Sequence, residues 1–213
     1  NEKDQKILHL FAELVSESRT RQVQVEASLE AVRYYGCLRC IQELRVHEKR
    51  WDTFLAQVLE LIAQATGFSH CFFCSRGGRG GTYGLEGSSG SLFPGEDRSL
   101  RFPLGSGIVG YVLKKHEPVF LGGDKAGGAI SPLFGAEIPT PPMRSLICLP
   151  LVVNRSARGA LGVADTSWRP LDESLKAFLW MVADHLGLFL ENLYLKSRLA
   201  EATSHLRDVV KKH

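Results

Sequence analysis

Residues 145–153, with the sequence SLICLPLVV, constrain the fold more than any other stretch of the chain. Apolar side chains follow one another without polar alternation, so both faces of this predicted strand have to be covered by other elements. A polar turn over residues 154–158 and a second apolar run, Gly159 to Asp165, complete a predicted β-hairpin. Pro150 lacks the N–H that a central strand needs, which taken alone argues against a central strand at this position. The hairpin predicts a sheet with packed layers on both sides.

A second organising stretch covers residues 99–124. Residues 100–104 alternate apolar side chains with others and predict a short strand, and residues 118–121 predict the next one. Between them, a glycine-rich turn leads into a predicted helix from Ile108 to His116, which Ser106 is expected to cap. The stretch therefore predicts a strand, a short helix and a strand.

Residues 105–110 also read Gly-Ser-Gly-Ile-Val-Gly, and Asp124 follows about twenty residues later, which is the spacing of a dinucleotide-binding site. The helix is short for a Rossmann crossover, and no further alternating strand–helix units follow. A dinucleotide-binding enzyme is therefore kept as the weaker alternative.

Helical periodicity marks the elements that should cover the sheet. Apolar residues at helical spacing predict a core helix from Trp51 to Thr66 that ends at a glycine. Asp172 is expected to cap a last helix, which continues without proline to the end of the sequence. Residues 68–75 and 82–85 predict two strands, and the Gly, Ser and Pro content of residues 87–98 predicts a loop.

Two phrases of this sequence resemble the GAF domain family. The order Phe-Pro-Leu, glycine turn, Gly-Ile-Val-Gly-Tyr-Val and Pro-Val-Phe-Leu over residues 102–121 is similar to the family's central segment. Arg-Ser-Leu-Ile-Cys-Leu-Pro-Leu, followed after a turn by Gly-Ala-Leu-Gly-Val, is similar to its most characteristic hairpin. The resemblance implies that Pro150 is tolerated in this strand, where we expect the hydrogen-bond ladder to open. The resemblance covers residues 51–195.

The fold that the resemblance implies is of the α+β class. It has a central antiparallel sheet with helices on one face, a pocket-forming short helix and loops on the other, and long helices at both termini. We expect an N-terminal helical extension over residues 1–46, a GAF domain over residues 47–190 and a C-terminal signalling or coiled-coil helix over residues 191–213.

The function that the resemblance implies is that of a non-catalytic sensory domain from a bacterial-type signalling or transcription-regulatory protein. It would bind a small molecule, dimerise, or do both, and transmit the signal through its terminal helices to an effector domain outside this segment. The alternatives are a constitutive dimerisation module without a ligand and a dinucleotide-binding or thiol-based redox enzyme. Residues that mark cyclic-nucleotide binding or methionine sulfoxide reduction in the family do not match here, and no cofactor is named.

The ligand pocket is expected between the central hairpin and the Ile108 helix, under a Gly- and Pro-rich flap over residues 125–143. Apolar walls with few polar groups favour a small, mostly uncharged ligand. The predicted ligand-binding residues are Phe102, Ile108, Val112, Asp124, Phe134 and Cys148.

The terminal helices predict a parallel homodimer. Residues 2–50 carry one apolar stripe, which Gly36 can interrupt and which needs a partner from its own domain or from a second copy. At the other end, leucines and small apolar residues recur with the heptad spacing of a coiled coil, with a polar Asn192 among them. The heptad members are Leu188, Leu195, Ala202 and Val209, with Leu199 and Leu206 interleaved.

Composition and cysteine placement exclude several other classes. The net charge of +3 is too small for a nucleic-acid surface, and no apolar run is long enough to span a membrane. We therefore expect a cytoplasmic protein without nucleic-acid or membrane partners. Cys37 and Cys40 form one C-x-x-C pair and Cys71 and Cys74 another, but the second pair lies on a predicted strand, where i and i+3 point to opposite faces. No structural metal is expected.

Overall fold

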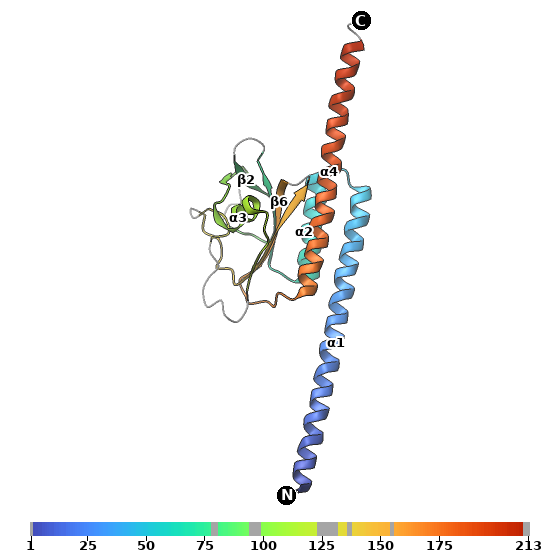
Figure 1. The fold of residues 1–213 in the computed structure, drawn as a ribbon, viewed down its shortest axis with the longest axis vertical. Coiled ribbons are helices and arrows are strands. Elements are labelled where there is room, and N and C mark those ends of the chain that lie inside the picture. Colours follow the sequence, from blue (N-terminus) through green and yellow to red (C-terminus); the bar gives the residue numbers. More distant parts are fainter. Residues whose placement is uncertain are drawn as a thin grey trace.

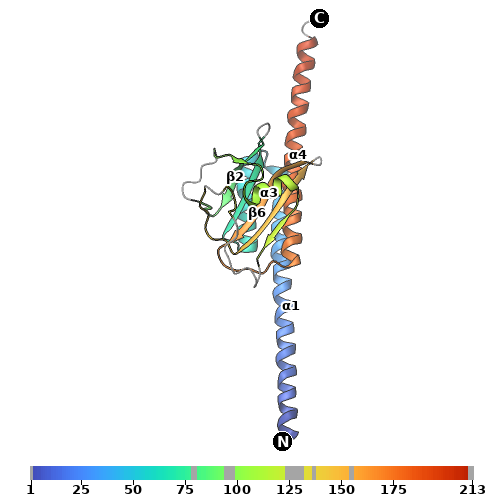
Figure 2. The same cartoon turned by 60° about the vertical axis from the view of Figure 1, so that its left-hand side comes forward.

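The structure, a computed structural model, describes residues 2–77, 81–93, 99–122, 132–135, 138–153 and 156–210; side chains are described from residue 15 onward, without 197, 198 and 200–210. Its centre is a six-stranded antiparallel sheet in the order β3-β2-β1-β6-β5-β4, flanked by four helices (Figures 1 and 2). The strands are β1 (His70–Arg76), β2 (Thr82–Ser89), β3 (Phe102–Pro103), β4 (Val119–Leu121), β5 (Ser145–Val153) and β6 (Ser156–Asp165). The helices are α1 (Glu2–His47), α2 (Trp51–Thr66), α3 (Gly107–Lys115) and α4 (Glu173–Val210).

This arrangement confirms the predicted fold class and its central hairpin. Strands β5 and β6 are both internal to the sheet and pair along their whole length. Pro150 pairs with Ala160 on one side, while on the other side β4 pairs with β5 only at Leu146–Cys148. Pro150 therefore lies beyond the end of the β4 ladder, as expected.

Two local predictions are wrong, one about where a loop begins and one about how α3 is capped. The predicted loop over residues 87–98 starts too early, because β2 continues to Ser89. Gly87 belongs to the strand because α2 lies directly against it: a Cβ there would be 3.1 Å from Leu55 Cδ2 and from Leu59 Cδ1. Ser106 occupies the N-cap position of α3 but makes no side-chain capping hydrogen bond.

Helices α2 and α4 cover one face of the sheet and α3 covers the other, as Figure 2 shows. The α2/α4 face holds the larger core. Its aromatic rings come from α1, α2, β1, α4 and the segment before β1, with Phe54 of α2 stacked on Phe189 of α4 at 4.1 Å between ring centroids. Two predicted helix ends are confirmed: Gly67 ends α2 in a left-handed conformation with φ +69°, and the Asp172 carboxylate accepts a hydrogen bond from the N–H of Leu175 at 2.8 Å.

Among the side chains that the structure describes, helix α1 packs on its own domain through its C-terminal half. Tyr34 stacks on Phe178 of α4 at 4.5 Å, and Cys37 and Ile41 are buried in the same cluster. Gly36 does not interrupt the helix. The described side chains nearer the N-terminus, such as Val25 and Leu29, are exposed because nothing in the domain reaches them. Figure 1 shows α1 leaving the domain at one end and α4 leaving at the other.

A buried carboxylate joins the loops at one end of the sheet. Asp165, the last residue of β6, is 2% exposed and accepts hydrogen bonds from the N–H and hydroxyl groups of Ser69 and Ser167 and from Nε of Arg169. Burial alone would raise the pKa of Asp165, but these hydrogen bonds outweigh it and lower the pKa to about 2. Asp165 is therefore a charged group, and its hydrogen bonds join the residue before β1 to the segment that leads into α4.

Candidate functional site

Five of the six predicted ligand-binding residues meet in one cluster between the sheet and α3. Phe102, Ile108, Val112, Phe134 and Cys148 are all buried and belong to the same set of contacting side chains. Asp124 lies outside the described residues. The residues selected from the sequence therefore lie together in the fold, and they come from β3, α3, β5 and the segment before β5.

Main-chain hydrogen bonds fix this cluster at the start of α3. The N–H groups of Ile108 and Val109 donate to the carbonyl oxygens of Pro132 and Leu133, at 3.2 and 3.1 Å. These carbonyls satisfy donors that a helix N-terminus leaves free, which is why a serine side chain is not needed there. Gly107, with φ +66°, permits the approach, because a Cβ at that position would overlap the carbonyl of Phe134.

Aromatic side chains fill the space beneath α3. The Phe134 ring stacks on Phe102 at 5.1 Å and contacts Phe93 at 5.7 Å and Phe72 at 6.0 Å. On the sheet side, Phe72 lies over Gly162, where any Cβ would overlap the ring. Rings from the chain itself therefore occupy the described part of the predicted pocket.

The thiol in this cluster is not activated. Burial raises the pKa of Cys148 to about 12 and that of Cys74 well above its ordinary value. Thiol chemistry proceeds through the thiolate, so neither group is a reactive nucleophile near neutral pH.

The two C-x-x-C pairs do not form chelating sites. Cys71 lies in the core on the α2/α4 face and Cys74 in the cluster on the α3 face, so their side chains point to opposite sides of β1, as predicted. On α1, Cys37 is buried and Cys40 is exposed. Within the described ranges, no three His, Cys, Asp or Glu side chains are grouped to hold a metal ion.

Comparison with known families decides the classification. The sequence profile of the GAF domain family matches residues 48–191, more than half of the chain. The chain belongs to the GAF domain family. GAF domains are sensory and regulatory folds of signalling proteins. No curated protein matches the chain significantly over its sequence.

Solved GAF domains share this fold at low sequence identity. The GAF domain of an Acinetobacter phosphoenolpyruvate-protein phosphotransferase is 21% identical, with a TM-score of 0.64 over 76% of this chain and 94% of that one. The corresponding domain from Coxiella burnetii is 20% identical, with a TM-score of 0.67 over 79% of this chain and 98% of that one. Free methionine-R-sulfoxide reductase from Neisseria meningitidis, solved with its substrate, is 23% identical, with a TM-score of 0.61 over 74% and 88%. Identities at this level support the fold alone.

The antiparallel sheet removes the structural basis of the dinucleotide alternative. A Rossmann site lies at the carboxyl ends of parallel strands, next to a crossover helix. Every strand pair among the described residues is antiparallel, and Gly107 instead lets α3 approach the segment around Phe134. Within the described residues, no helix is long and apolar enough to cross a membrane.

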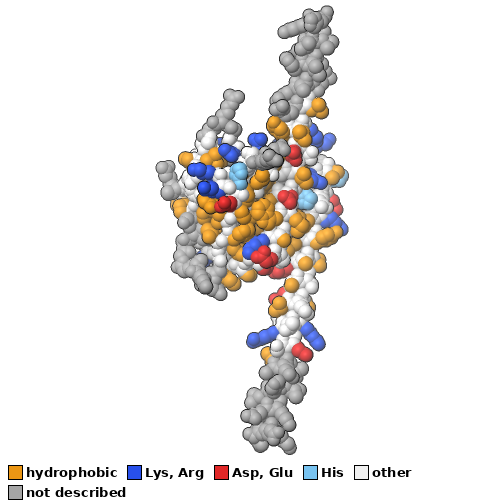
Figure 3. All heavy atoms as spheres, viewed as in Figure 1, with side chains coloured by type: hydrophobic (Ala, Val, Ile, Leu, Met, Phe, Trp, Pro, Cys, Tyr) orange, Lys and Arg blue, Asp and Glu red, His pale blue; other side chains and the backbone are white. Residues whose placement is uncertain are grey.

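The outer side of α4 carries an exposed apolar stripe. Leu188, Leu195 and Leu199 are 46%, 54% and 70% exposed, and Met181 continues their spacing toward the N-terminus. We call these four residues the α4 seam. Figure 3 shows hydrophobic side chains gathered where α4 leaves the domain. Inside the domain, the α4 seam lies between a groove along β5, lined by Val152 and other residues, and a second groove along α1.

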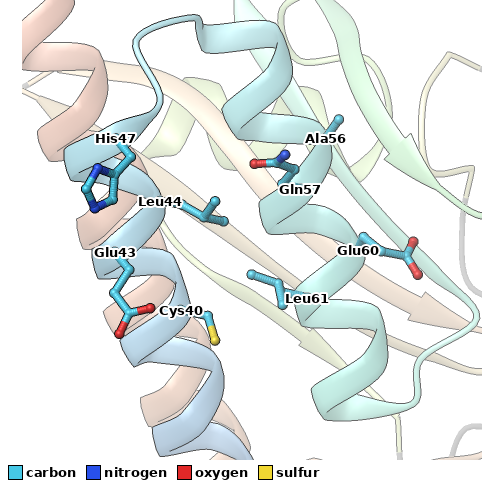
Figure 4. A pocket seen from close by; sticks show the side chains of 8 residues that line it. All are labelled: Cys40, Glu43, Leu44, His47, Ala56, Gln57, Glu60 and Leu61. Atoms are coloured by element: carbon cyan, nitrogen blue, oxygen red, sulfur yellow. The ribbon is translucent and has the colours of Figure 1, made fainter.

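Two further hollows lie on the helical side of the domain. One is an open groove of about 710 Å³ between α1 and α2, where Leu44 and Leu61 face each other between Glu43 and Glu60 (Figure 4). The other, about 310 Å³, lies where the sheet, the first turn of α2 and residues 190–194 of α4 meet. Sequence reasoning missed this second hollow, because Trp51, Glu86 and Tyr194 come from elements far apart in the chain and no spacing links them.

The filled cluster under α3 makes a measurable prediction. Val112→Trp is expected to lower the free energy of unfolding by about 1–3 kcal/mol, because Val112 is fully buried among packed side chains. Urea unfolding followed by circular dichroism measures this. Tyr111→Trp, on the exposed side of the same helix, is the matched control. A Val112→Trp protein as stable as the parent would instead indicate open space for a ligand.

Proposed function

We propose that this GAF domain is a non-catalytic regulatory module that works as a parallel homodimer and passes its state along α4 to an effector domain. The observation that carries this proposal is the continuity of α4. Residues 173–210 form one helix, whose N-terminal part lies in the core against the sheet and whose C-terminal part extends beyond the domain.

Continuity matters because a rigid helix moves as one body. Leu175, Phe178, Leu186 and Phe189 are buried in the α2/α4 core, so α4 has to follow any shift of the sheet. The same helix presents the α4 seam to solvent over the following turns. A change in the domain would therefore reach the seam without a hinge between them.

The α4 seam supports pairing with a second copy. Met181, Leu188 and Leu195 lie seven residues apart and Leu199 four residues further on, which is the spacing that keeps one helix face toward a parallel partner. Asn192 is exposed on the same face and would set the register. Apolar side chains this exposed, in a continuous stripe, are typical of association surfaces.

The proposed setting is a cytoplasmic signalling or transcription-regulatory protein. The module has no part of its own that contacts nucleic acid or membrane in this proposal, and its direct partners are a second copy of the chain and the effector.

Cross-linking tests the proposal directly. In a Cys40→Ser background, Leu195→Cys is expected to form an intermolecular disulfide on mild oxidation, because equivalent seam positions of a parallel pair face each other. Tyr194→Cys, which is equally exposed but lies on another side of the helix, is the matched control and should cross-link far less. Non-reducing electrophoresis measures both. Equal cross-linking of the two variants, or a monomer in sedimentation equilibrium at about 100 µM, would contradict the dimer.

A small-molecule sensor is the second candidate function. The observation in its favour is that five residues chosen from the sequence as pocket walls do meet under α3. Native mass spectrometry of the purified protein would reveal a bound molecule, and Val112→Trp should remove it. The aromatic filling by Phe134 supports the dimeric module more strongly.

A further inference from the structure

We propose that the hollow between Trp51, Glu86 and Tyr194 binds a small organic ammonium ion with an apolar or aromatic body. The inference goes beyond the proposed dimer, since the hollow lies on the opposite face of the sheet from the cluster under α3. Its volume of about 310 Å³ is at the lower end of the range for ligand pockets, about 300–1,000 Å³.

Aromatic rings form much of the wall. Trp51 contacts Phe73 edge-on at 5.3 Å between ring centroids and Phe189 at 5.9 Å, so packing from α2, β1 and α4 holds its indole in place. Tyr194 adds a third ring at the mouth of the hollow. The face of an aromatic ring attracts a cation by about 0.5–2 kcal/mol, and cages of such rings are the usual receptors for organic ammonium ions.

A carboxylate supplies the charge. Glu86 is half-buried; its Oε2 accepts a hydrogen bond from the indole N–H of Trp51 at 2.7 Å, and its Oε1 accepts one from the Ser75 hydroxyl. Both donors are neutral, and within the described residues Glu86 takes part in no ion pair. These two bonds orient the carboxylate without neutralising it, which leaves a fixed negative group at the wall of an aromatic hollow.

The remaining charges favour a cation over an anion. Glu191 of α4 and Arg158 of β6 also line the hollow, so its formal charge is −1. Arg158 is exposed and can extend into water, whereas Glu86 is held by its two donors. An ammonium group beside Glu86 would therefore meet the fixed charge, and the apolar body would lie against Leu190 and the rings.

The position of the hollow gives such a ligand a role. Its walls belong to β1, β2 and β6 of the sheet and to residues 190–194 of α4, the last turns before the helix leaves the domain. A ligand that binds only when these turns are packed against the sheet stabilises that packed arrangement, by a free energy that increases with the logarithm of its concentration once this exceeds the dissociation constant. In an α-helix each residue turns by about 100°, which puts Leu190 and Leu193 nearly opposite Leu188 and Leu195. A second copy and the ligand could then bind α4 together.

Phenethylamine serves as the probe, with 2-phenylethanol as its neutral counterpart and 3-phenylpropanoate as its anionic one. The full chain contains three tryptophans, Trp51, Trp168 and Trp180, each of which contributes one indole N–H signal to a ¹⁵N-labelled spectrum, and Trp51→Phe assigns the relevant one. We expect phenethylamine to shift the Trp51 signal and to bind at least about tenfold more tightly than 2-phenylethanol, a ratio equivalent to ~1.4 kcal/mol.

Variants separate the site from unspecific binding. Glu86→Gln keeps an acceptor for Trp51 but removes the charge, and is expected to weaken phenethylamine binding about tenfold. Glu60→Gln, a carboxylate on the other groove of α2, is the matched control and should have no effect. Tyr194→Leu, at an exposed position that tolerates change, should weaken binding about threefold and guards against a folding defect in the Glu86 variant.

Four outcomes would overturn the inference: no shift of the Trp51 signal at 10 mM phenethylamine, equal binding of 2-phenylethanol, tighter binding of 3-phenylpropanoate, or unchanged binding by Glu86→Gln. Sedimentation of Glu86→Gln keeps this test apart from the dimer, because the variant should associate as the parent does. A monomeric parent that still binds the amine would contradict the proposed function and leave the ammonium site standing.

Discussion

Replacing Leu195 and Leu199 together by Asp is expected to convert the proposed dimer into a monomer while the domain stays folded. Both side chains project from α4 and are largely exposed in the single chain, 54% for Leu195 and 70% for Leu199, so the substitution removes little buried surface within the domain. In a paired helix it would put two carboxylates from each copy into an apolar seam. Desolvation of an unpaired charge costs several kcal/mol, so the dissociation constant should rise on the order of 100-fold or more.

Sedimentation equilibrium over a range of concentrations measures this effect, and circular dichroism checks the fold. Tyr194→Asp introduces one such charge at an exposed position of α4 that does not belong to the seam, and should leave association unchanged. If the double Asp variant still dimerises as the parent does, the α4 seam is not the interface.

Removing the Asp165 carboxylate is expected to have the largest effect on stability. Asp165→Ala leaves the N–H of Ser69, the N–H of Ser167 and Nε of Arg169 without the buried carboxylate that accepts from all three. Loss of one partner from a buried, charged network costs about 3–5 kcal/mol. Urea unfolding at pH 7 measures the change. Asp172→Ala, which removes a helix cap, should cost only about 1 kcal/mol, and an equal loss in both variants would contradict a special role for Asp165.

The same carboxylate predicts the acid limb of the stability profile. The folded protein holds the pKa of Asp165 at about 2, below its ordinary 3.8, so the charged form is favoured by folding. This contribution, about 2 kcal/mol, is fully present above pH 4 and is lost as the pH falls through 4 toward 2. Asp165→Asn should therefore show a shallower loss of stability between pH 4 and 2 than the parent does.

Local chemistry made the framework of the fold predictable. The apolar run of β5, the Asp172 cap and the glycine that ends α2 each depend on neighbours in sequence, and all three stand where expected. Gly87 and Ser106 were misjudged because their surroundings come from elsewhere: α2 lies against Gly87, and the carbonyls of Pro132 and Leu133 replace the Ser106 side chain. Gly87 in a strand and Ser106 without a capping hydrogen bond both result from tertiary contacts, which the periodicity of the sequence does not reveal.

The site could be predicted only in part, for the same reason. Apolar character and nearness to α3 were enough to group Phe102, Val112 and Cys148. Whether their cluster is hollow depends on how Phe134 packs, which no pattern in the sequence specifies. The hollow at Glu86 is lined by residues from α2, α4 and four strands, and the indole hydrogen bond from Trp51 to Glu86 becomes visible only once the sheet order is known.

Helices α1 and α4 run side by side in the same direction over the domain and leave it at opposite ends, with Tyr34 stacked on Phe178 between them. The domain thus fixes how α4, the helix that leaves it, is rotated about its axis relative to α1, the helix that enters it. One residue inserted into α1 before Tyr34 would rotate the preceding part of the helix by about 100° relative to the domain, whereas seven residues would bring it back to nearly the same angle. A chain built this way can accept spacers of whole heptads before Tyr34, but other lengths would change which side of α1 meets a partner aligned with the α4 seam.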